Sequence, residues 1–399
     1  MPDPKPRISI GCPIFNSKET SLRRSLDSLE GQTFTSFEAI ICDNSTDASI
    51  RDICMEYVDR DSRFRYHHNG ANFGANYNFI RALHLAEAEY FKWVADDDKL
   101  EPTYLEKCVA VLDADPSVSL CYTHSAILTP EGDRKDDDGG RIVAMQESPV
   151  DRFKSVLTQR WKATGYYGVF RTDHVRRAHP MLDECMRLDD VLMLAEITLY
   201  GKIHQIPEEL FTYTENPKPW DDREQLNARH YDACLPNNPL RGITFPNLKF
   251  AYELIQAVRY SPIDIADKEQ LYACIPSIVK QILHPVWKQE IQRAIFLILN
   301  GRLLHNWGDD VQQPALSTQG TVPHVFAFHA GELLRRFDEV LHLWPDYPDP
   351  GFHTARAALF GMCGRLHEAQ FAVQLDLARF PNYEVAQKFK AQLDAAMRG

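Results

Sequence analysis

The segment Tyr90-Phe91-Lys92-Trp93-Val94-Ala95-Asp96-Asp97-Asp98 is largely apolar and strand-like, and it ends in three consecutive carboxylates. Like charges about 4 Å apart repel by roughly 1 kcal/mol in water and by roughly 4 kcal/mol at the effective dielectric of a protein surface. Three aspartates where a buried strand emerges therefore indicate a divalent cation, and carboxylate oxygens suit Mg²⁺ or Mn²⁺. In the alternative reading Asp98 begins the next helix ahead of Pro102, which accounts for one aspartate of the three.

A second triple carboxylate, Asp136-Asp137-Asp138, provides an internal comparison. It follows Asp133-Arg134-Lys135, precedes Gly139-Gly140 and has no apolar strand leading into it. Such charged and glycine-rich surroundings are typical of a solvated loop. We therefore expect no metal site there, and we expect Asp137→Asn to change little.

Outward from residues 90–98, short apolar segments alternate with amphipathic stretches between Arg7 and about Tyr122. The predicted strands are Ile8–Ile14, Phe37–Cys42, Phe64–His68, Tyr90–Ala95 and Val118–Tyr122. The predicted helices, with apolar residues at three- and four-residue spacing, are Ser21–Leu29, Ile50–Arg60, Ala75–Ala86 and Tyr104–Asp113. This alternation predicts an α/β fold with a doubly wound, mostly parallel sheet flanked by helices.

Polar residues follow four of the predicted strands. These loops are Pro13–Asn16, Asp43–Asp47, Asn69–Asn76 and Asp96–Asp98. Taken singly, most have an ordinary interpretation, such as a helix cap at Asp43–Asp47 or a tight turn at Asn72-x-Gly74. Ligands bind outside the carboxyl ends of the strands in such sheets, so four polar loops on one rim indicate a binding site.

The composition is that of a soluble globular protein, with 44% hydrophobic and 25% charged residues among 399, enough for two or three domains. The 44 basic and 56 acidic residues give a formal charge of -12, which argues against nonspecific binding of nucleic acid or anionic membranes. Nine cysteines without a Cys-x-x-Cys pair indicate buried, reduced thiols. Residues 1–7 lack the apolar core of a signal peptide, and no later run is long enough to span a bilayer. We therefore expect a cytoplasmic protein whose membrane contact, if any, is peripheral.

The second half of the chain has a different pattern. Residues 217–246 fit either a mobile loop over the site or a linker, residues 247–304 read as helices, and residues 306–323 read as a polar hinge. The last part resembles a tetratricopeptide unit at Ala357, Phe360, Gly364, Ala369 and Pro381, although Asp376 stands where a small residue is usual. We predict domains at 1–215, 216–305 and 306–399, with the last packing on the rest of the chain or binding a second copy or another protein.

The order of the motifs between residues 7 and about 215 resembles the family 2 glycosyltransferases, which have the GT-A fold of nucleotide-diphospho-sugar transferases. The matching residues are Pro13-Ile14-Phe15-Asn16, Gln32-Thr33, Asp43–Asp47, Asn72-x-Gly74, Asp96–Asp98 with Pro102, Asp189-Asp190, Gly201-Lys202 and Pro207. The resemblance covers roughly half of the chain, and its ordered succession is more specific than any one motif. It implies a GT-A domain followed by an α-helical C-terminal region.

The resemblance also implies roles for individual residues. The residues it assigns to the nucleotide-sugar donor are Pro13, Phe15, Asn16, Asp43, Asn72, Gly74 and Asp96, with Asp43 on the base. The ligands it implies for Mn²⁺ or Mg²⁺, in place of the family's Asp-x-Asp motif, are Asp96, Asp97 and Asp98. Many relatives read Asp-x-Asp-Asp, whereas Ala95 occupies the first of these positions here. Which two of the three aspartates bind the metal therefore stays open.

Two further interpretations have alternatives. Asp190 occupies the family's base position, but it also fits a helix cap for residues 191–200. Tyr166 and Tyr167 could either stack on an acceptor sugar or pack between sheet and helix.

The implied reaction needs a Lewis acid at the departing diphosphate, supplied by the metal, and a base for the acceptor hydroxyl, for which Asp190 is the candidate. Direct attack opposite the diphosphate inverts the anomeric centre. We thus expect an inverting transferase that moves sugar from a UDP- or dTDP-sugar to a saccharide, lipid-linked or protein acceptor, in synthesis of surface polysaccharide, lipopolysaccharide or glycoprotein. Two alternatives stay open: a sugar nucleotidyltransferase, for which Gly11-Cys12-Pro13 lacks the usual basic glycine-rich loop, and a catalytically weak nucleotide-sugar-binding scaffold acting through the C-terminal helices.

Overall fold

The computed structural model describes residues 5–129, 132–137, 141–142, 144–158, 163–178, 189–215, 246–279, 281–282, 324–343 and 351–398. The chain divides into two compact units, Met1–Asn237 with Gln256–Leu271, and Asn238–Ile255 with Tyr272–Gly399. The predicted boundaries after residues 215 and 305 fall at the edge of 216–245 and inside 283–323, which lie outside the described residues. These boundaries therefore stay predictions.

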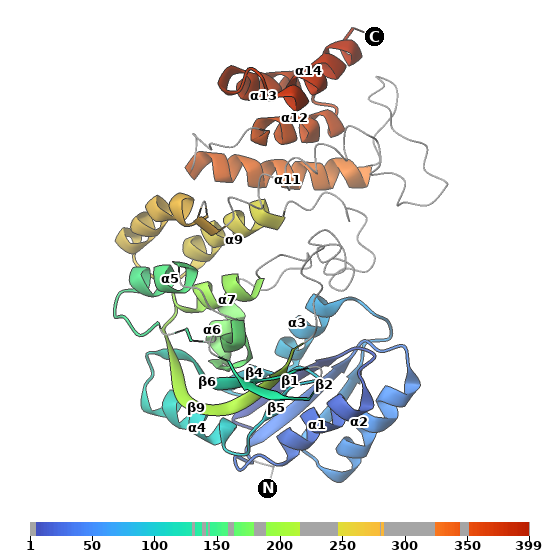
Figure 1. Ribbon diagram of the computed structural model, residues 1–399, viewed down its shortest axis with the longest axis vertical. Helices are drawn as coiled ribbons and strands as arrows, with labels where there is room; N and C mark the ends of the chain where they lie inside the picture. Colours follow the sequence, from blue (N-terminus) through green and yellow to red (C-terminus); the bar gives the residue numbers. More distant parts are fainter. Residues whose placement is uncertain are drawn as a thin grey trace. The chain divides into compact units, whose positions relative to one another are not determined.

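The first unit is built on one mixed sheet (Figure 1). Its strands are β1 (Ile8–Ile14), β2 (Phe37–Asp43), β3 (Phe64–His68), β4 (Tyr90–Trp93), β5 (Lys99–Leu100), β6 (Val118–Leu128), β7 (Arg134–Asp136), β8 (Val169–Arg171) and β9 (Lys202–Thr214). They follow the order β3-β2-β1-β4-β8-β6-β9-β5, with β7 paired to β6. β3, β2, β1 and β4 are parallel, whereas β8 runs antiparallel to both β4 and β6. The five predicted strands are confirmed, and the sheet is parallel in its first half and mixed in its second.

Helices cover both faces of the parallel strands, as predicted. The side chains of Ile8, Ile10, Cys12 and Ile14 share one core with α1 (Glu19–Glu30), α2 (Ala48–Arg60) and α4 (Tyr104–Ala114). On the other face α3 (Ala75–Leu85) comes so close to Gly11 that a Cβ there would lie 2.7 Å from the Ala82 Cβ. The alternation of side chains along β1 thus assigns one face to three helices and the other to α3.

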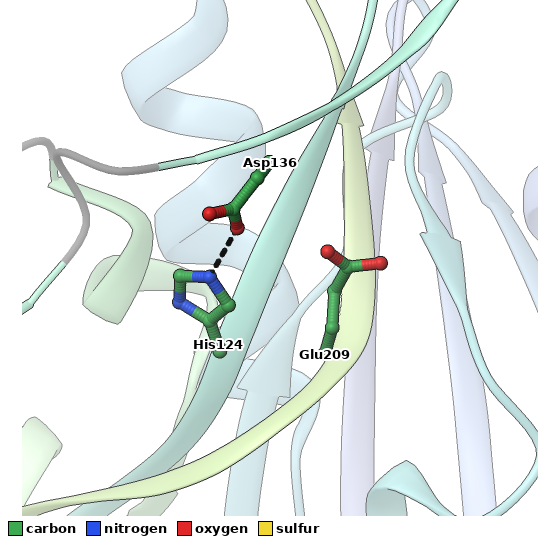
Figure 2. Close-up of side chains that lie close together, drawn as sticks. All are labelled: His124, Asp136 and Glu209. Carbon is green, nitrogen blue, oxygen red and sulfur yellow. Dashed lines mark hydrogen bonds and ion pairs between the residues drawn. The ribbon is translucent and has the colours of Figure 1, made fainter.

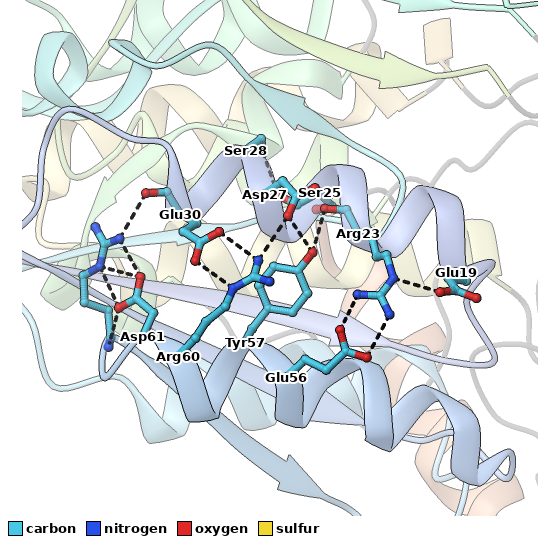
Figure 3. Close-up of polar contacts among 11 residues, drawn as sticks. Glu19, Arg23, Ser25, Asp27, Ser28, Glu30, Glu56, Tyr57, Arg60 and Asp61 are labelled. Carbon is cyan, nitrogen blue, oxygen red and sulfur yellow. Dashed lines mark hydrogen bonds and ion pairs between the residues drawn. The ribbon is translucent and has the colours of Figure 1, made fainter.

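Ion pairs join the solvent-facing sides of α1 and α2 (Figure 3). Arg23 donates to Glu19 at 2.8 Å and to Glu56 at 2.6 Å. Arg60 reaches Glu30 at 2.8 Å, and the Tyr57 hydroxyl donates to Asp27 at 2.6 Å. These exposed contacts fix the register of the two helices more than they stabilise the fold, because such pairs contribute roughly 0–1 kcal/mol each.

The second triple carboxylate is not the solvated loop that we predicted. β7 pairs antiparallel with β6, and Asp137 directly after it is buried. The Asp137 carboxylate accepts a hydrogen bond from Ser125 Oγ at 3.0 Å, whereas the Asp136 side chain is exposed. Pairing with β6 turns Asp137 inward, which a run of charges along the sequence does not reveal. Asp138 lies outside the described residues.

The second unit contains the predicted C-terminal helices. They are α11 (His324–Leu343), α12 (Phe352–Met362), α13 (Leu366–Arg379) and α14 (Glu384–Ala396), while α9 (Pro246–Tyr260) contributes to both units. Ala357, Phe360 and Ala369 are buried, and Gly364 takes a φ of +71° in the turn between α12 and α13. The helical prediction is confirmed, and the assignment to the tetratricopeptide class stays a prediction.

Asp376, which departs from the tetratricopeptide pattern, has a structural role. The N-cap of α12 is Gly351, which offers no side-chain acceptor. Asp376 on α13 is buried, and its Oδ2 accepts hydrogen bonds from the Thr354 amide at 2.5 Å and the Thr354 hydroxyl at 2.6 Å. The following helix therefore caps the preceding one.

Two predictions made from composition can be checked. Cys12, Cys42, Cys54, Cys108 and Cys121 are buried free thiols, as expected, whereas the free thiols Cys274 and Cys363 are half-buried. In the part of the chain that the structure describes, none of the helices is both long and apolar enough to cross a membrane.

Replacement of Asp376, the α13 residue that caps α12, should destabilise both helices. We expect Asp376→Ala to lower the free energy of unfolding of α12 and α13 by about 1–3 kcal/mol, because it leaves buried donors at the start of α12 unsatisfied. Hydrogen exchange of the amides of residues 352–379 measures this loss. Asp338→Ala, which removes an exposed partner of Arg356, is the control and should cost less than about 1 kcal/mol; equal effects of the two substitutions would contradict the capping role.

Candidate active site at the carboxyl ends of β1 to β4

The four polar loops lie along one edge of the sheet, because β3, β2, β1 and β4 are parallel neighbours (Figure 1). Backbone hydrogen bonds join these loops directly. The Asn44 amide donates to the Ile14 carbonyl at 3.1 Å, and the Asn69 amide donates to the Asp43 carbonyl at 2.9 Å. The rim predicted from the sequence is therefore present, and its loops support one another.

Three asparagine side chains that the sequence analysis did not single out hold the rim together. Asn69 Nδ2 donates to Asn44 Oδ1 at 2.8 Å and to Asn78 Oδ1 at 2.7 Å. Asn44 Nδ2 donates to the Gly74 carbonyl at 2.9 Å, and Asn78 Nδ2 donates to the Ile14 carbonyl at 3.0 Å. Because Asn44 and Asn78 are buried, these bonds are costly to break and keep the loops in one arrangement.

The residues predicted to contact the donor fall into two groups. Pro13 is buried inside β1 and Asp43 is buried at the end of β2, so both shape the rim from within. The Asp43 carboxylate accepts from the Ser45 amide at 2.7 Å and from the Tyr66 hydroxyl at 2.6 Å. Burial raises the pKa of the Tyr66 phenol, and the adjacent carboxylate adds to the rise, so Tyr66 stays a donor.

Phe15 and Asn16, in contrast, are exposed on the rim, and 47% of Phe15 is accessible. Asn16 takes a left-handed φ of 46°, and its Oδ1 accepts from the Thr46 amide at 3.1 Å. This turn leaves Phe15 as a large apolar surface beside the polar loops. An exposed aromatic side chain there suits a flat ring system, such as a nucleotide base.

Asn72 and Gly74 form the turn that begins α3. Asn72 Oδ1 accepts from the Gly74 amide at 2.9 Å, as in the tight turn that we considered from sequence. Gly74 has φ 93° and ψ 166°, a backbone conformation that other residues rarely adopt. Both residues therefore have a structural role, whichever ligand the loop binds.

The three aspartates after β4 lie in different surroundings. Asp98 is buried, and its Oδ2 accepts from the Ala95 amide at 3.4 Å; burial, with Asp97 beside it, raises the pKa of Asp98 to about 8. Asp96 is half-buried and accepts a hydrogen bond from Ser17 Oγ; burial, with a smaller contribution from Asp97, raises the pKa of Asp96. Carboxylates with raised pKa and hard oxygen donors fit a divalent cation, which would offset both burial and repulsion.

The three carboxylates do not converge on one point. Within the described residues, the one set of three potential ligand atoms that all lie within 4.8 Å of one another belongs to another part of the sheet. In this arrangement a metal at Asp96–Asp98 would take fewer than three of these carboxylates. Substrate phosphates and water complete such sites for Mg²⁺ and Mn²⁺.

That other set consists of His124, Asp136 and Glu209, on β6, β7 and β9 (Figure 2). His124 Nε2 lies 2.5 Å from Asp136 Oδ1, and Arg134 lies 2.6 Å from Glu209 Oε1. Asp136 is thus paired with His124 on the adjacent strand β6, and Glu209 is paired with Arg134 on β7, which lies on the other side of β6. These two polar pairs explain the cluster without a metal.

Lys92 is a buried charged residue that the sequence analysis passed over. Its side chain lies in β4 with no exposed surface, donates to the Tyr167 carbonyl and approaches the Tyr104 hydroxyl at 3.5 Å. Its Nζ also lies 4.5 Å from the centre of the Tyr104 ring. Burial lowers the pKa of Lys92 to about 8, while Asp98 is among the groups that oppose this change.

A short helix connects the acidic loop with the helix that carries Asp190. In η1 (Ala163–Tyr167) the ring of Tyr166 stacks on Trp93 of β4, with centroids 5.1 Å apart. A Cβ at Gly165 would lie 3.6 Å from Leu194 of α7 (Asp189–Ile197), so η1 packs between β4 and α7. Tyr166 is buried and Tyr167 stacks on Phe211, which supports the core interpretation of both tyrosines.

Asp190 lies at the start of α7, and its side chain is half-buried. Its Oδ1 accepts a hydrogen bond from the Val191 amide at 2.8 Å. This is the helix-terminal contact that we considered as the alternative to a catalytic role. The contact supports the helix-terminal interpretation, and the catalytic role stays a prediction.

Comparison with known proteins gives consistent results. Residues 9–172 match the family described as Glycosyl transferase family 2. EpsH of Bacillus subtilis, provisionally named a glycosyltransferase, is 27% identical over 191 residues, which cover 46% of this chain and 54% of EpsH. YibD of Escherichia coli K12, named an uncharacterized glycosyltransferase, is 30% identical over 182 residues, which cover 42% of this chain and 49% of YibD. The chain thus spans about half the length of these curated relatives.

Among solved structures, S. aureus TarS residues 1–349 in complex with UDP-GlcNAc is similar, with a TM-score of 0.53 and 15% sequence identity. The match covers 92% of this chain and 91% of that one. At this identity the similarity concerns the fold, and it confirms the predicted GT-A architecture.

The turn at Gly74 offers a test of how rigid the rim is. We expect Gly74→Ala to lower the free energy of unfolding by about 1–3 kcal/mol, the strain of a side chain in this conformation. It should also speed hydrogen exchange at Asn44 and Asn69, because the Gly74 carbonyl anchors the asparagine network.

Gly132→Ala is the matched control, because Gly132 has a φ of 92° in the turn between β6 and β7. It should impose a similar strain and leave exchange at Asn44 unchanged. If both variants alter the rim equally, the network is not anchored at Gly74.

Proposed function

We propose that this chain, whose residues 9–172 form a glycosyl transferase family 2 domain, transfers a sugar from a nucleoside-diphosphate sugar to a hydroxyl acceptor. The observation that carries the proposal is the rim itself. Four loops rich in Asn and Asp meet at the carboxyl ends of parallel strands, and the last of them ends in Asp96–Asp98. A donor with a flat base and a charged diphosphate requires an aromatic surface, fixed polar groups and a site for a cation.

The donor we propose is a UDP- or dTDP-sugar. Phe15 is exposed beside the loop after β2, where it can stack on a pyrimidine. The TarS structure of similar fold holds UDP-GlcNAc, so UDP-sugars are the first donors to test. One relative, 31% identical over 128 residues, is named chondroitin synthase, and a saccharide is accordingly the first acceptor to test.

The diphosphate is the part of the donor that needs a cation. One or two of the carboxylates of Asp96, Asp97 and Asp98 would hold Mn²⁺ or Mg²⁺, which would supply Lewis acidity at the departing phosphate. The Asp98 side chain is buried, whereas Asp96 and Asp97 are half-buried and so within reach of a bound ligand. Ser17 holds the Asp96 carboxylate by a hydrogen bond from its hydroxyl. These carboxylates would hold the cation that offsets the negative charge of the diphosphate.

Asp190 is the proposed base. Oδ1 of its half-buried carboxylate accepts a hydrogen bond from the Val191 amide, which fixes the side chain, and the carboxylate would accept the proton of the acceptor hydroxyl. Attack by that hydroxyl opposite the leaving diphosphate forms the new glycosidic bond with inversion. The proton passes to Asp190 as the bond to the diphosphate breaks.

Asp97→Asn separates metal binding from the fold. We expect this variant to lose Mn²⁺-dependent binding of UDP-sugar by at least tenfold, because an amide is a poorer ligand for a hard cation than a carboxylate. Isothermal titration with and without Mn²⁺ measures the change. Asp59→Asn, an exposed aspartate on α2, is the control and should bind like the wild type. Asp137 is unsuitable as a control because it is buried.

Asp190→Asn tests the base. Asparagine can still accept from the Val191 amide, so the start of α7 should be preserved. We expect donor binding within twofold of the wild type, and sugar transfer, followed as UDP release in the presence of acceptor, reduced by at least a hundredfold.

Both variants together decide the division of roles. Equal loss of donor binding in Asp97→Asn and Asp190→Asn would contradict it. Normal turnover in Asp190→Asn would remove Asp190 as the base. Donor binding without turnover in the wild type, with every acceptor class tested, would favour the nucleotide-sugar-binding scaffold.

A further inference from the structure

One side of α1, which carried no motif in the sequence analysis, contacts the acidic loop along its whole length. Three side chains of α1, and the side chain of Gln32 just after it, form hydrogen bonds with backbone groups of residues 95–101. These contacts are Ser25 Oγ to the Ala95 carbonyl at 2.9 Å, Arg24 Nη2 to the Asp97 carbonyl at 2.5 Å, the Leu100 amide to Ser28 Oγ at 3.2 Å, and Gln32 Nε2 to the Glu101 carbonyl at 2.9 Å. The backbone of residues 95, 97, 100 and 101 is thus bonded by side chains of α1 or of Gln32 just after it.

The Asp97 carbonyl is the point where a third element joins. Thr214 Oγ1, at the end of β9, donates to this carbonyl at 2.8 Å, and Arg24 Nη2 lies 2.9 Å from the same hydroxyl oxygen. Arg24, Thr214 and the Asp97 carbonyl therefore form a closed triangle. Next to it, β5 pairs with β9 through Lys99 and Thr212, so the loop is held between α1 and β9.

A carbonyl that accepts two hydrogen bonds fixes the peptide plane between Asp97 and Asp98. The direction in which each side chain leaves the backbone depends on that plane, so the triangle restricts where both carboxylates can lie. Carbonyl and hydroxyl groups in a preorganised loop need no rearrangement when a ligand binds.

We propose that Arg24 and Thr214 are positioning residues, which hold the acidic loop in the arrangement that binds a divalent cation together with a diphosphate. The inference rests on the proposed function, because it concerns the same metal and donor. It adds two residues, from the helix after β1 and from the last strand, that touch neither metal nor substrate in this role.

Because Arg24 is positively charged, the direction of the change in metal affinity on its removal tests the proposal. Within the described residues the hydrogen bonds of Arg24 go to two neutral oxygens, whereas neighbouring Arg23 pairs with Glu19 and Glu56. A guanidinium near the loop would by itself repel a bound cation. Removing it should therefore strengthen metal binding if charge dominates, and weaken it if positioning dominates.

The experiment measures Mn²⁺-dependent binding of UDP by titration for the full chain and four variants. We expect Arg24→Met and Thr214→Val each to weaken this binding five- to twentyfold and to change metal-free UDP binding less than twofold. The double variant should lose less than the product of the two single losses, because both groups act on one carbonyl. Arg23→Met, on the same helix, is the matched control and should stay within twofold of the wild type.

Three results would overturn the proposal. These are unchanged Mn²⁺-dependent binding in Thr214→Val, tighter binding in Arg24→Met, and equal losses with and without metal, which would indicate general destabilisation. Thermal unfolding of each variant separates the last case from positioning.

A second readout keeps the proposal testable if the wild type binds no UDP with Mn²⁺, a result that would count against the proposed function. Hydrogen exchange of residues 94–100 in the metal-free protein should then be at least tenfold faster in Arg24→Met than in Arg23→Met. Equal exchange in these two variants would show that the triangle does not hold the loop and would overturn the positioning role.

Discussion

The central position of β1 is the constraint on which the rest of the site depends. β1 pairs in parallel with β2 on one side and with β4 on the other, so three loops from distant parts of the sequence start at the same edge. The Val94 amide still donates to the Gly11 carbonyl at 2.9 Å, which carries the pairing to the last residue before the acidic loop. The close approach of α3 requires Gly11 at this point, because any side chain would meet Ala82. A small residue in the middle of one strand thereby permits the packing that supports the loops after β1, β2 and β4.

The three carboxylates of Asp96–Asp98 concentrate negative charge in the loop after β4. Asp98 is buried in the loop after β4, and Lys92 is a buried cation within β4. Burial favours the neutral form of each residue: it lowers the pKa of Lys92 to about 8 and raises the pKa of Asp98 to about 8. The two side chains therefore do not form a strong ion pair with each other. The loop backbone is held in place by hydrogen bonds from side chains of α1 and β9.

The sequence predicted the elements that repeat a pattern and missed those that depend on contacts between distant residues. Apart from the short strand β5, the strands and helices up to Tyr122 follow from the spacing of apolar residues, and the rim follows from the parallel order. β9 was not predicted because Pro207 and its charged neighbours break the alternation of a half-buried strand. The prediction that Asp137 lies in a solvated loop was wrong because its inward position depends on pairing with β6. Arg24 and Thr214 are 190 residues apart, and no local spacing connects them.

The cap that α13 provides for α12 has a consequence for how this part of the chain can be divided. A helix that depends on a carboxylate in the next helix is not an independent piece of structure, even where its own sequence favours it. A fragment ending between residues 363 and 375 would keep all of α12 and still leave the donors at its start unsatisfied, because Asp376 would be missing. The smallest separable element here is therefore the helix pair, and any exchange of segments between related proteins has to move both helices together.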